Sequence, residues 1–296
     1  MKRMLLVPRS AEEARPYAAF FEAKGYECIT VMRQSLFLEK SLYITNDGIH
    51  YQGKDLSAGI DAALVTDSGY MWPQPVTPLT EEQWGGYKNR LDEFLRNERE
   101  ASSMWYSFLG ILNETATVCI NPQRAFEFQA FKPWAFEELR NAGIPLPPIM
   151  TGNDDVRIQS FMENHPGVYL KVPLTDSDSP EWLETHVAKE RSFADSPALL
   201  QALTSKEESR VLVVGGRVVW TDGKGSRTAG AESKIWESIP ILQECLSMPY
   251  AELTLRMSDG TMLSDFNAAP DITRIPDIHQ RSALEAILGI LEEGYK

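Results

Sequence analysis

The order of apolar runs in the first third of the chain predicts a small parallel unit. Three short aliphatic runs are typical of buried strands, at 3–7, 28–32 and 62–65. A helical pattern separates the first two, and the capping-box spacing of Ser10 and Glu13 opens it. Strand, helix and strand in this order favour a Rossmann-like unit. Because the chain has no G-x-G-x-x-G sequence, we do not expect a dinucleotide site in it.

Residues that break regular structure set the limits of the neighbouring elements. Pro16 is expected to delay the first helix by about one turn, and Gly25 is expected to end it. The sequence Asn46-Asp47-Gly48 is typical of a hairpin turn between two short strands. A long helical pattern then follows from 80 to 112.

The pattern changes near Cys119, where a region of mixed helices and strands begins. Asn121 and Pro122 are suited to be the cap and first residue of a helix that extends to Gly143. Beyond a proline-rich connection we expect a helix, a strand, two hairpins and a C-terminal helix. Their ranges are 156–163, 168–173, 210–220 around Gly215-Gly216, 250–267 around Ser258-Asp259-Gly260, and 277–293.

Composition narrows the class of protein. The 296 residues include 29 Lys+Arg and 42 Asp+Glu, a formal charge of −13, with 43% hydrophobic and 24% charged residues, as in globular domains. This acidic balance excludes nucleic acid and anionic membranes as bulk partners, since both require clustered cations. No apolar run is long enough for a membrane span, and the N-terminal one is too short for a signal peptide. Three scattered cysteines and four histidines without ligand spacing predict a cytoplasmic protein without a zinc site.

Candidate chemistry lies in the C-terminal part of the chain. Lys171 occurs inside an apolar strand, Lys132 in an aromatic helix and Arg210 at the start of a hairpin strand. Taken singly, each is explained at least as well by a solvated surface charge.

Three oxygen-bearing side chains are expected to meet across the last hairpin. Asp265 and Asn267 are two positions apart and share one face of their strand, and the turn brings Glu252 near them. Such a set suits Mg²⁺, which prefers hard oxygen ligands. A solvated polar edge of the sheet is the alternative interpretation.

From Asn121 to the C-terminus, the ordered motifs resemble the ATP-grasp superfamily. They look closest to the ligases that modify ribosomal-protein tails and to ribosomal-peptide maturases of the microviridin type. The motifs are NPQRAFEFQAFKPWAFEELRNAGIPLPP, VYLKVPL, PALLQAL, SRVLVVGGRVVW, AELTLRMSDG and LSDFNAAPDI. The resemblance implies an α/β ATP-grasp fold, with the nucleotide between two α+β subdomains, preceded by a Rossmann-like pre-ATP-grasp domain. The implied domains are 1–118 for the latter, 119–198 for the small subdomain, and 199–296 for the C-terminal subdomain with the metal site.

The resemblance also implies roles for single residues, with ATP and Mg²⁺ (or Mn²⁺) as cofactors and Lys171 and Arg210 as the catalytic pair. In chain order these are the phosphate-binding Lys132 and Lys171, the adenine hinge at Gln201 and Leu203, the ribose-binding Glu208, the phosphoryl-facing Arg210, and the magnesium ligands Glu252, Asp265 and Asn267.

Two departures from the superfamily pattern bear on these roles. Relatives usually have Asp where this chain has Glu252 and often Glu where it has Asp265, and both exchanges keep a carboxylate. The loop 175–181, TDSDSPE, has no glycine, whereas many relatives use glycine N–H groups there to close over the phosphates. Its acidic side chains would repel phosphate.

The implied activity is an ADP-forming ligation of a carboxylate to an amine or a hydroxyl through an acyl phosphate, on a peptide or a small molecule. The alternative is a non-catalytic ATP-binding regulatory or scaffold protein of the same fold, which the glycine-free loop favours. Arg256, Lys224 and Arg227 are candidate substrate-binding residues, although each is equally explained as a solvated charge. No nucleic-acid or membrane partner is expected, and a homodimer is one candidate assembly.

Overall fold

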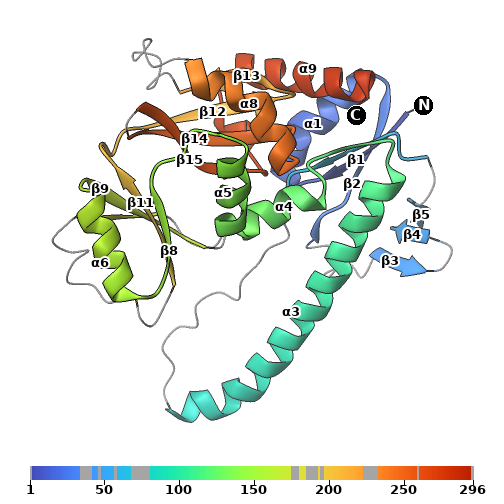
Figure 1. Ribbon diagram of the computed structural model, residues 1–296. Coiled ribbons are helices and arrows are strands. Elements are labelled where there is room, and N and C mark those ends of the chain that lie inside the picture. Colours follow the sequence, from blue (N-terminus) through green and yellow to red (C-terminus); the bar gives the residue numbers. More distant parts are fainter. Residues whose placement is uncertain are drawn as a thin grey trace. The chain divides into compact units, whose positions relative to one another are not determined.

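The chain divides into two compact units, Met1–Cys119 and Ile120–Lys296, and each is described by itself. The computed structural model in Figure 1 describes residues 2–33, 42–45, 48–56, 59–67, 81–174, 180–184, 193, 197–222, 233–258 and 260–294. Among these residues, no helix is long and apolar enough to cross a membrane.

Unit 1 is built on a four-stranded sheet of order β2-β1-β6-β7, in which β1 runs parallel to both β2 and β6. The three strands predicted from the apolar runs are therefore present. A separate antiparallel sheet, β3-β4-β5, contains the predicted hairpin. The elements are β1 (Lys2–Val7), α1 (Ala11–Ala23), β2 (Tyr26–Thr30), β3 (Leu42–Thr45), β4 (Gly48–Tyr51), β5 (Lys54–Asp55), β6 (Ala62–Val65), α3 (Glu81–Thr115) and β7 (Val118–Ile120).

Side-chain capping fixes the start of α1. The hydroxyl of Ser10 accepts a hydrogen bond from the backbone N–H of Glu13 at 3.2 Å, and the Glu13 carboxylate accepts one from the N–H of Arg9 at 3.0 Å. The delay expected from Pro16 is wrong, because this cap starts the helix at Ala11 and Pro16 is accommodated inside it. The helix ends before Gly25, whose φ of 87° favours glycine.

Unit 2 contains two antiparallel four-stranded sheets. Sheet I has the order β10-β9-β11-β8 and sheet II the order β13-β12-β14-β15. The elements are α4 (Gln123–Ala130), α5 (Lys132–Asn141), β8 (Ile149–Gly152), α6 (Asp155–Asn164), β9 (Val168–Val172), β10 (Glu181–Leu183), β11 (Ala198–Leu203), β12 (Glu208–Val214), β13 (Arg217–Thr221), α8 (Ser233–Leu246), β14 (Tyr250–Ser258), β15 (Gly260–Asn267), a 3-10 turn (Ile272–Arg274) and α9 (Asp277–Glu293).

The single helix predicted up to Gly143 is wrong, since the chain forms α4 and α5 with a break at Phe131. Pro133 explains the break. A proline cannot donate the backbone hydrogen bond of a helix interior, and its ring clashes with the preceding turn, but it is tolerated in the first turn of a new helix.

Asn121 does not cap α4 as expected, because Pro122 occupies the cap position without a side-chain bond. The Asn121 side chain is instead buried, and it donates to the carbonyl oxygens of Tyr250 at 2.6 Å and Ala268 at 2.5 Å. It also accepts a bond from the N–H of Tyr250 at 3.2 Å. Asn121 therefore fastens the start of unit 2 to sheet II.

Both predicted hairpins of sheet II are present. Val214 lies opposite Arg217 across Gly215-Gly216, whose φ values of 56° and 76° suit a two-residue turn. In the other hairpin, Leu255 lies opposite Leu263 and Thr254 lies opposite Asp265. Ser264 is thus an extra residue on β15, a β-bulge.

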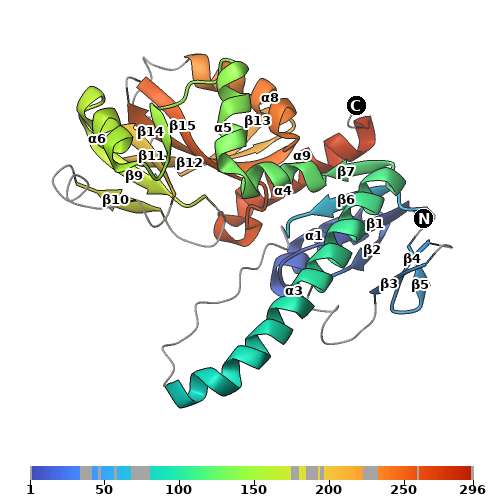
Figure 2. The same cartoon turned by 60° about the horizontal axis from the view of Figure 1, so that its bottom comes forward.

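Helices cover one side of sheet I and one side of sheet II, as Figures 1 and 2 show. On sheet I, Ile158 and Met162 of α6 join a buried cluster with Tyr169 and Leu200. On sheet II, α9 packs against β12 and β13, α8 packs against β15, and Phe136 of α5 contacts Phe266. The opposite side of sheet II is the one that carries polar residues.

Candidate functional site

One face of sheet II collects most of the predicted site residues. Residues directly opposite each other on neighbouring strands share a face. The register places three successive rungs across β12, β14 and β15. These are Leu212–Glu252–Asn267, Arg210–Thr254–Asp265 and Glu208–Arg256–Met262. We call Glu208, Arg210, Glu252, Thr254, Arg256, Asp265 and Asn267 the polar face.

Lys132 reaches the polar face from α5. Its ammonium group lies 2.9 Å from Oδ1 and 3.1 Å from Oδ2 of Asp265, and its side chain is only 6% exposed. The N–H of Phe266 also donates to Oδ1 of Asp265 at 2.9 Å. A predicted phosphate lysine and a predicted metal ligand are therefore partners in a largely buried ion pair.

Asn267 is held by its own network. Its Oδ1 accepts from Nε2 of Gln129 at 3.3 Å and from the N–H of Ala269 at 2.9 Å. Gln129 also accepts a bond from the N–H of Ala268 at 2.7 Å. An amide oxygen has two lone pairs, so both of those on Asn267 are engaged.

Glu208 lies between two arginines. Nη2 of Arg256 donates to its Oε2 at 2.6 Å, and Nη2 of Arg210 lies 3.5 Å from its Oε1. The Arg256 guanidinium also lies 4.8 Å from the ring centre of Trp182 on β10. Burial lowers the pKa of Arg256, and the nearby carboxylates of Glu208 and Asp265 oppose that shift.

Among the described residues, a ring contact and a pair of hydrogen bonds link sheet I to sheet II beside the polar face. Trp182 touches Arg256, and Gln201 forms a reciprocal pair with Ser264, donating to its carbonyl oxygen at 2.7 Å and accepting from its hydroxyl at 2.7 Å. The register of sheet I puts Trp182, Leu170 and Gln201 on one face. The site therefore lies between the two sheets.

Lys171 has a different position from the other candidates. It lies opposite Leu200 and Glu181, on the face of sheet I that packs on α6 rather than on the face of Gln201. Leu203 shares the Gln201 face. Lys224, Arg227 and most of the glycine-free loop lie outside the described residues.

The donor set of the polar face fits a divalent cation. Within the described residues, Oδ2 of Asp265 accepts only from Lys132, so it keeps a lone pair for a metal. Glu252 is on the neighbouring rung, and Asn267 could join by releasing one hydrogen bond. The described residues contain no group of three or more His, Cys, Asp or Glu side chains able to hold a metal. A site with few protein ligands suits Mg²⁺, which keeps waters and phosphate oxygens in its shell.

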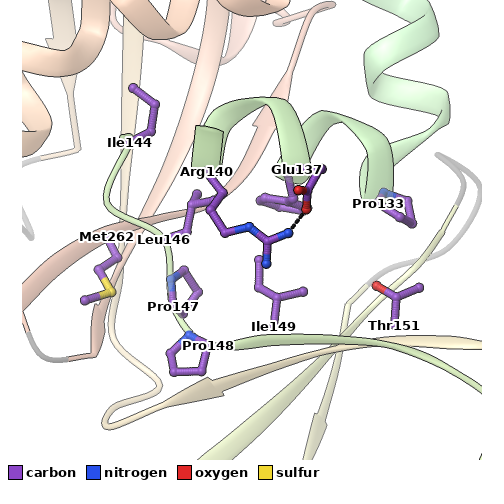
Figure 3. A pocket seen from close by; sticks show the side chains of 11 residues that line it. Pro133, Glu137, Arg140, Ile144, Leu146, Pro147, Pro148, Ile149, Thr151 and Met262 are labelled. Atoms are coloured by element: carbon purple, nitrogen blue, oxygen red, sulfur yellow. Dashed lines mark ion pairs between the residues drawn. The ribbon is translucent and has the colours of Figure 1, made fainter. Parts of the chain in front are cut away.

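A cavity of about 620 Å³ is lined by other residues. Figure 3 shows α5, the proline-rich connection and β8 around it, with Met262 of β15 at one side. The lining is mostly apolar, and Arg140 is paired there with Glu137. The cavity includes none of the predicted site residues.

Known proteins resemble this chain in structure rather than in sequence. No protein-family model and no curated protein matches it in sequence. Solved structures do match over nearly the whole chain. One is "ATP-grasp ligase PsnB complexed with minimal precursor, Mg, and ADP", at 17% identity and a TM-score of 0.75, covering 98% of this chain and 97% of that one.

Two further structures are similar at low identity. The macrocyclase MdnC from Microcystis aeruginosa MRC, bound with precursor peptide MdnA, has 12% identity and a TM-score of 0.68, covering 97% of this chain and 99% of that one. A RimK domain protein ATP-grasp from Sphaerobacter thermophilus has 15% identity and a TM-score of 0.62, with 98% of both chains covered. The chain has the ATP-grasp fold. The ATP-grasp fold implied by the motifs is confirmed, and the Rossmann-like character of the preceding domain stays a prediction.

Within this ATP-grasp fold, sequence reasoning missed three residues of the site. Thr254 is directly opposite Asp265, Gln129 holds Asn267, and Trp182 covers Arg256. The first could have been found by counting the strand alternation from Glu252. Gln129 and Trp182 act across long sequence separations and give no local signal.

Proposed function

We propose that this protein is an ATP-dependent, ADP-forming ligase that joins a carboxylate to an amine or a hydroxyl through an acyl phosphate, with a peptide as substrate. The polar face carries the proposal, because it gathers Glu208, Arg210, Glu252, Asp265 and Asn267 opposite sheet I, with Lys132 at its edge. Structures similar to this chain are complexes with ADP, AMPPNP, Mg and precursor peptides, which supports a nucleotide, a metal and a peptide here.

In this proposal the nucleotide lies between the sheets. Gln201 and Leu203 mark the hinge near the base, Glu208 accepts from the ribose hydroxyls, and Lys132, Lys171 and Arg210 hold the phosphates. The carboxylates of Glu252 and Asp265, with Asn267, would hold Mg²⁺, which neutralises phosphate charge when bound. The position of Lys171 on the α6 face makes its role the one most in need of a direct test.

The protein's contribution to the reaction would be positioning and fixed charge. The substrate carboxylate attacks the terminal phosphorus and ADP leaves, and the amine or hydroxyl then displaces phosphate from the acyl phosphate. Charge spreads over the transferring group in the first step, so fixed cations at Arg210 and Lys132 would stabilise it. Along the polar face, Glu208 is on one rung and Arg210 and Asp265 are on the next. This order matches a nucleotide with its ribose at Glu208 and its phosphates near Asp265.

The alternative is a nucleotide-binding protein without turnover. The pairing of Lys132 with Asp265 and the engaged oxygen of Asn267 favour it, because phosphate and metal would have to compete with these internal bonds. For unit 1 we infer the Rossmann-like domain that precedes an ATP-grasp fold, supported by the parallel strands β2, β1 and β6. The domain limits at 118 and 198, the cytoplasmic location and a homodimer remain proposals.

The test is direct binding followed by turnover. Calorimetry with Mg–ADP should show binding, and phosphate release from ATP should then appear only with an acceptable peptide. Lys171→Ala and Asp265→Asn should each reduce turnover by at least about a hundredfold, since each removes a charged contact to the transferring group or its metal.

Matched controls exist on the same unit. Lys234→Ala and Asp277→Asn change exposed residues of α8 and α9 and should leave binding and turnover unaltered. Circular dichroism would confirm that all four variants fold. Folded Asp265→Asn with full activity would contradict the proposal. Nucleotide binding without phosphate release for any peptide or amino acid would favour the alternative.

A further inference from the structure

Arg256 is a buried cation whose hydrogen-bonding capacity is not filled. Its side chain is 5% exposed, and only Nη2 is bonded, to Glu208. Nε and Nη1 are buried and have no hydrogen-bond partner among the described residues. Leaving a buried donor unpaired costs free energy, and the cost is greater for a charged group.

A purely structural role does not account for this arrangement. Glu208 already has Arg210 as a second partner, and Arg210 is half-exposed and so costs less to hold in place. An apolar residue at 256 would fill the space between the sheets without unpaired donors. The open donors therefore indicate a ligand that supplies acceptor atoms.

The position of Arg256 in sheet II indicates which part of a ligand its open donors would bind. Along β14 the same face carries Glu252, Thr254 and Arg256 in order, and Asp265 lies opposite Thr254. Arg256 is thus one rung beyond the Asp265 position, on the side away from Asn267, and directly opposite Glu208. If Glu208 binds the ribose, Arg256 is at the nucleoside end and not at the end where a substrate carboxylate would meet the phosphates.

The face of the guanidinium gives a second indication. The indole of Trp182 lies over it at 4.8 Å, in the space between the sheets. Indole and purine are both flat two-ring systems, and a guanidinium stacks well on either. Trp182 is only partly buried and sits in the three-residue strand β10, so it occupies a position from which it can be displaced.

Resting on the proposed function, we propose that Arg256 is a nucleoside-binding residue. The edge of its guanidinium donates from Nε and Nη1 to ribose oxygens, while Glu208 accepts from the ribose hydroxyls. The flat face carries the base where the Trp182 indole now lies. A hydroxyl both donates and accepts hydrogen bonds, so a paired carboxylate and guanidinium recognise a diol from both sides.

The experiment measures the affinities of Mg–ADP and of magnesium tripolyphosphate, which lacks the nucleoside. Arg256→Met and Arg256→Lys should lower the affinity for Mg–ADP by about tenfold to a hundredfold. The affinity for tripolyphosphate should stay within about twofold of the wild type. Arg217→Lys, an exposed arginine of β13, is the matched control and should change neither affinity.

Trp182 provides a readout that does not depend on altering Arg256. Mg–ADP should change the tryptophan emission of the wild-type protein, because it moves the indole off the guanidinium. Trp182→Phe should still bind Mg–ADP but lose that part of the emission change.

Each other outcome overturns the inference. Equal Mg–ADP affinity in folded Arg256 variants, or an emission change in Trp182→Phe as large as that of the wild type, would refute it and leave the proposed function standing. An equal loss of affinity for tripolyphosphate would show that Arg256 binds the phosphates and not the nucleoside. An unchanged Mg–ADP affinity with a raised KM for the substrate would make it a substrate-carboxylate residue. A wild-type protein that binds no nucleotide would remove the proposed function as well.

Discussion

The ammonium group of Lys132 bonds to both carboxylate oxygens of Asp265, at 2.9 and 3.1 Å, although the two residues are 133 positions apart. The pair joins α5 to the edge strand of sheet II. It also makes the two predicted functions of these residues interdependent, because any cation at Asp265 shares its oxygens with the lysine. The ion pair should therefore matter to stability before any ligand is bound.

We expect Lys132→Met to lower the free energy of unfolding by about 2–3 kcal/mol, since it leaves the Asp265 carboxylate without its main partner in a low-dielectric position. The double variant with Asp265→Asn should recover part of the loss. Urea unfolding of the wild type, both single variants and the double variant would give a coupling energy of about 1–3 kcal/mol. The exposed pair Arg281–Glu285 is the control, with a coupling below about 0.5 kcal/mol. A Lys132–Asp265 coupling no larger than this would contradict the prediction.

The buried pair of Gln201 and Ser264 should be similarly coupled. Both residues are fully buried, and each forms two hydrogen bonds with the other at 2.7 Å. Ser264→Ala leaves Oε1 of Gln201 without its donor and should lower the free energy of unfolding by about 1–3 kcal/mol. Gln201→Leu should lower it by about the same amount. Thermal unfolding of the double variant should show a loss smaller than the sum of the single losses. Strictly additive losses would mean that the two sheets are not held together through this pair.

Asn121 combines a left-handed backbone with a buried side chain. Its φ is 57°, and its amide donates to two carbonyl oxygens and accepts from an N–H. Asn121→Ala should lower the free energy of unfolding by about 3 kcal/mol, because these groups become unpaired. Asn121→Gly should be about 1 kcal/mol more stable than Asn121→Ala, since glycine tolerates the left-handed backbone conformation. Asn121→Asp should be the least stable, because a carboxylate oxygen would face two carbonyl oxygens. Chemical denaturation would rank them, and an Asp variant as stable as wild type would be inconsistent with the network.

The thiol of Cys119 should make the free energy of unfolding depend on pH in the alkaline range. Burial raises the pKa of Cys119 from 9.0 to about 12. As pH rises above 9 the unfolded chain loses this proton first, so the free energy of unfolding should fall by up to about 1.4 kcal/mol per pH unit until about pH 12. Below pH 9 this group contributes no slope. Cys119→Ala should remove that share of the alkaline slope in urea titrations at pH 8, 9, 10 and 11. Identical slopes in the two proteins would show that the thiol ionises normally.

Much of the fold could be predicted from the sequence because local signals agree with the final structure. Gly215-Gly216 and the capping pair Ser10 and Glu13 act within a few residues, and their elements are found where expected. Pro133 is also a local signal, and the single helix predicted across it is wrong because the proline starts a second helix. The side chain of Asn121 fits a cap equally well, and only its partners on β14 and after β15 explain its real role.

The candidate site was predictable in part. The register brings together Glu208, Arg210, Glu252, Asp265 and Asn267 on one face. The pairing of Lys132 with Asp265 and the cover of Trp182 over Arg256 depend on how sheet I, α5 and sheet II pack. No spacing along the chain encodes these contacts, because each joins elements far apart in sequence.

The extra residue Ser264 has a consequence for how β15 can evolve. On a regular strand, Leu263 and Asp265 would point to the same side, yet here they lie opposite Leu255 and Thr254, which point to opposite sides. Deleting Ser264 would make the pairing regular, with Leu263 still opposite Leu255 and Asp265 still opposite Thr254, so Asp265 and Asn267 would keep their side of the sheet. The loss of Ser264 would remove the bulge and the bonds to Gln201 and leave the carboxylate on the polar face. A one-residue insertion or deletion between Asp265 and Asn267 would instead turn one of the two to the other face, and we expect it to be tolerated less well.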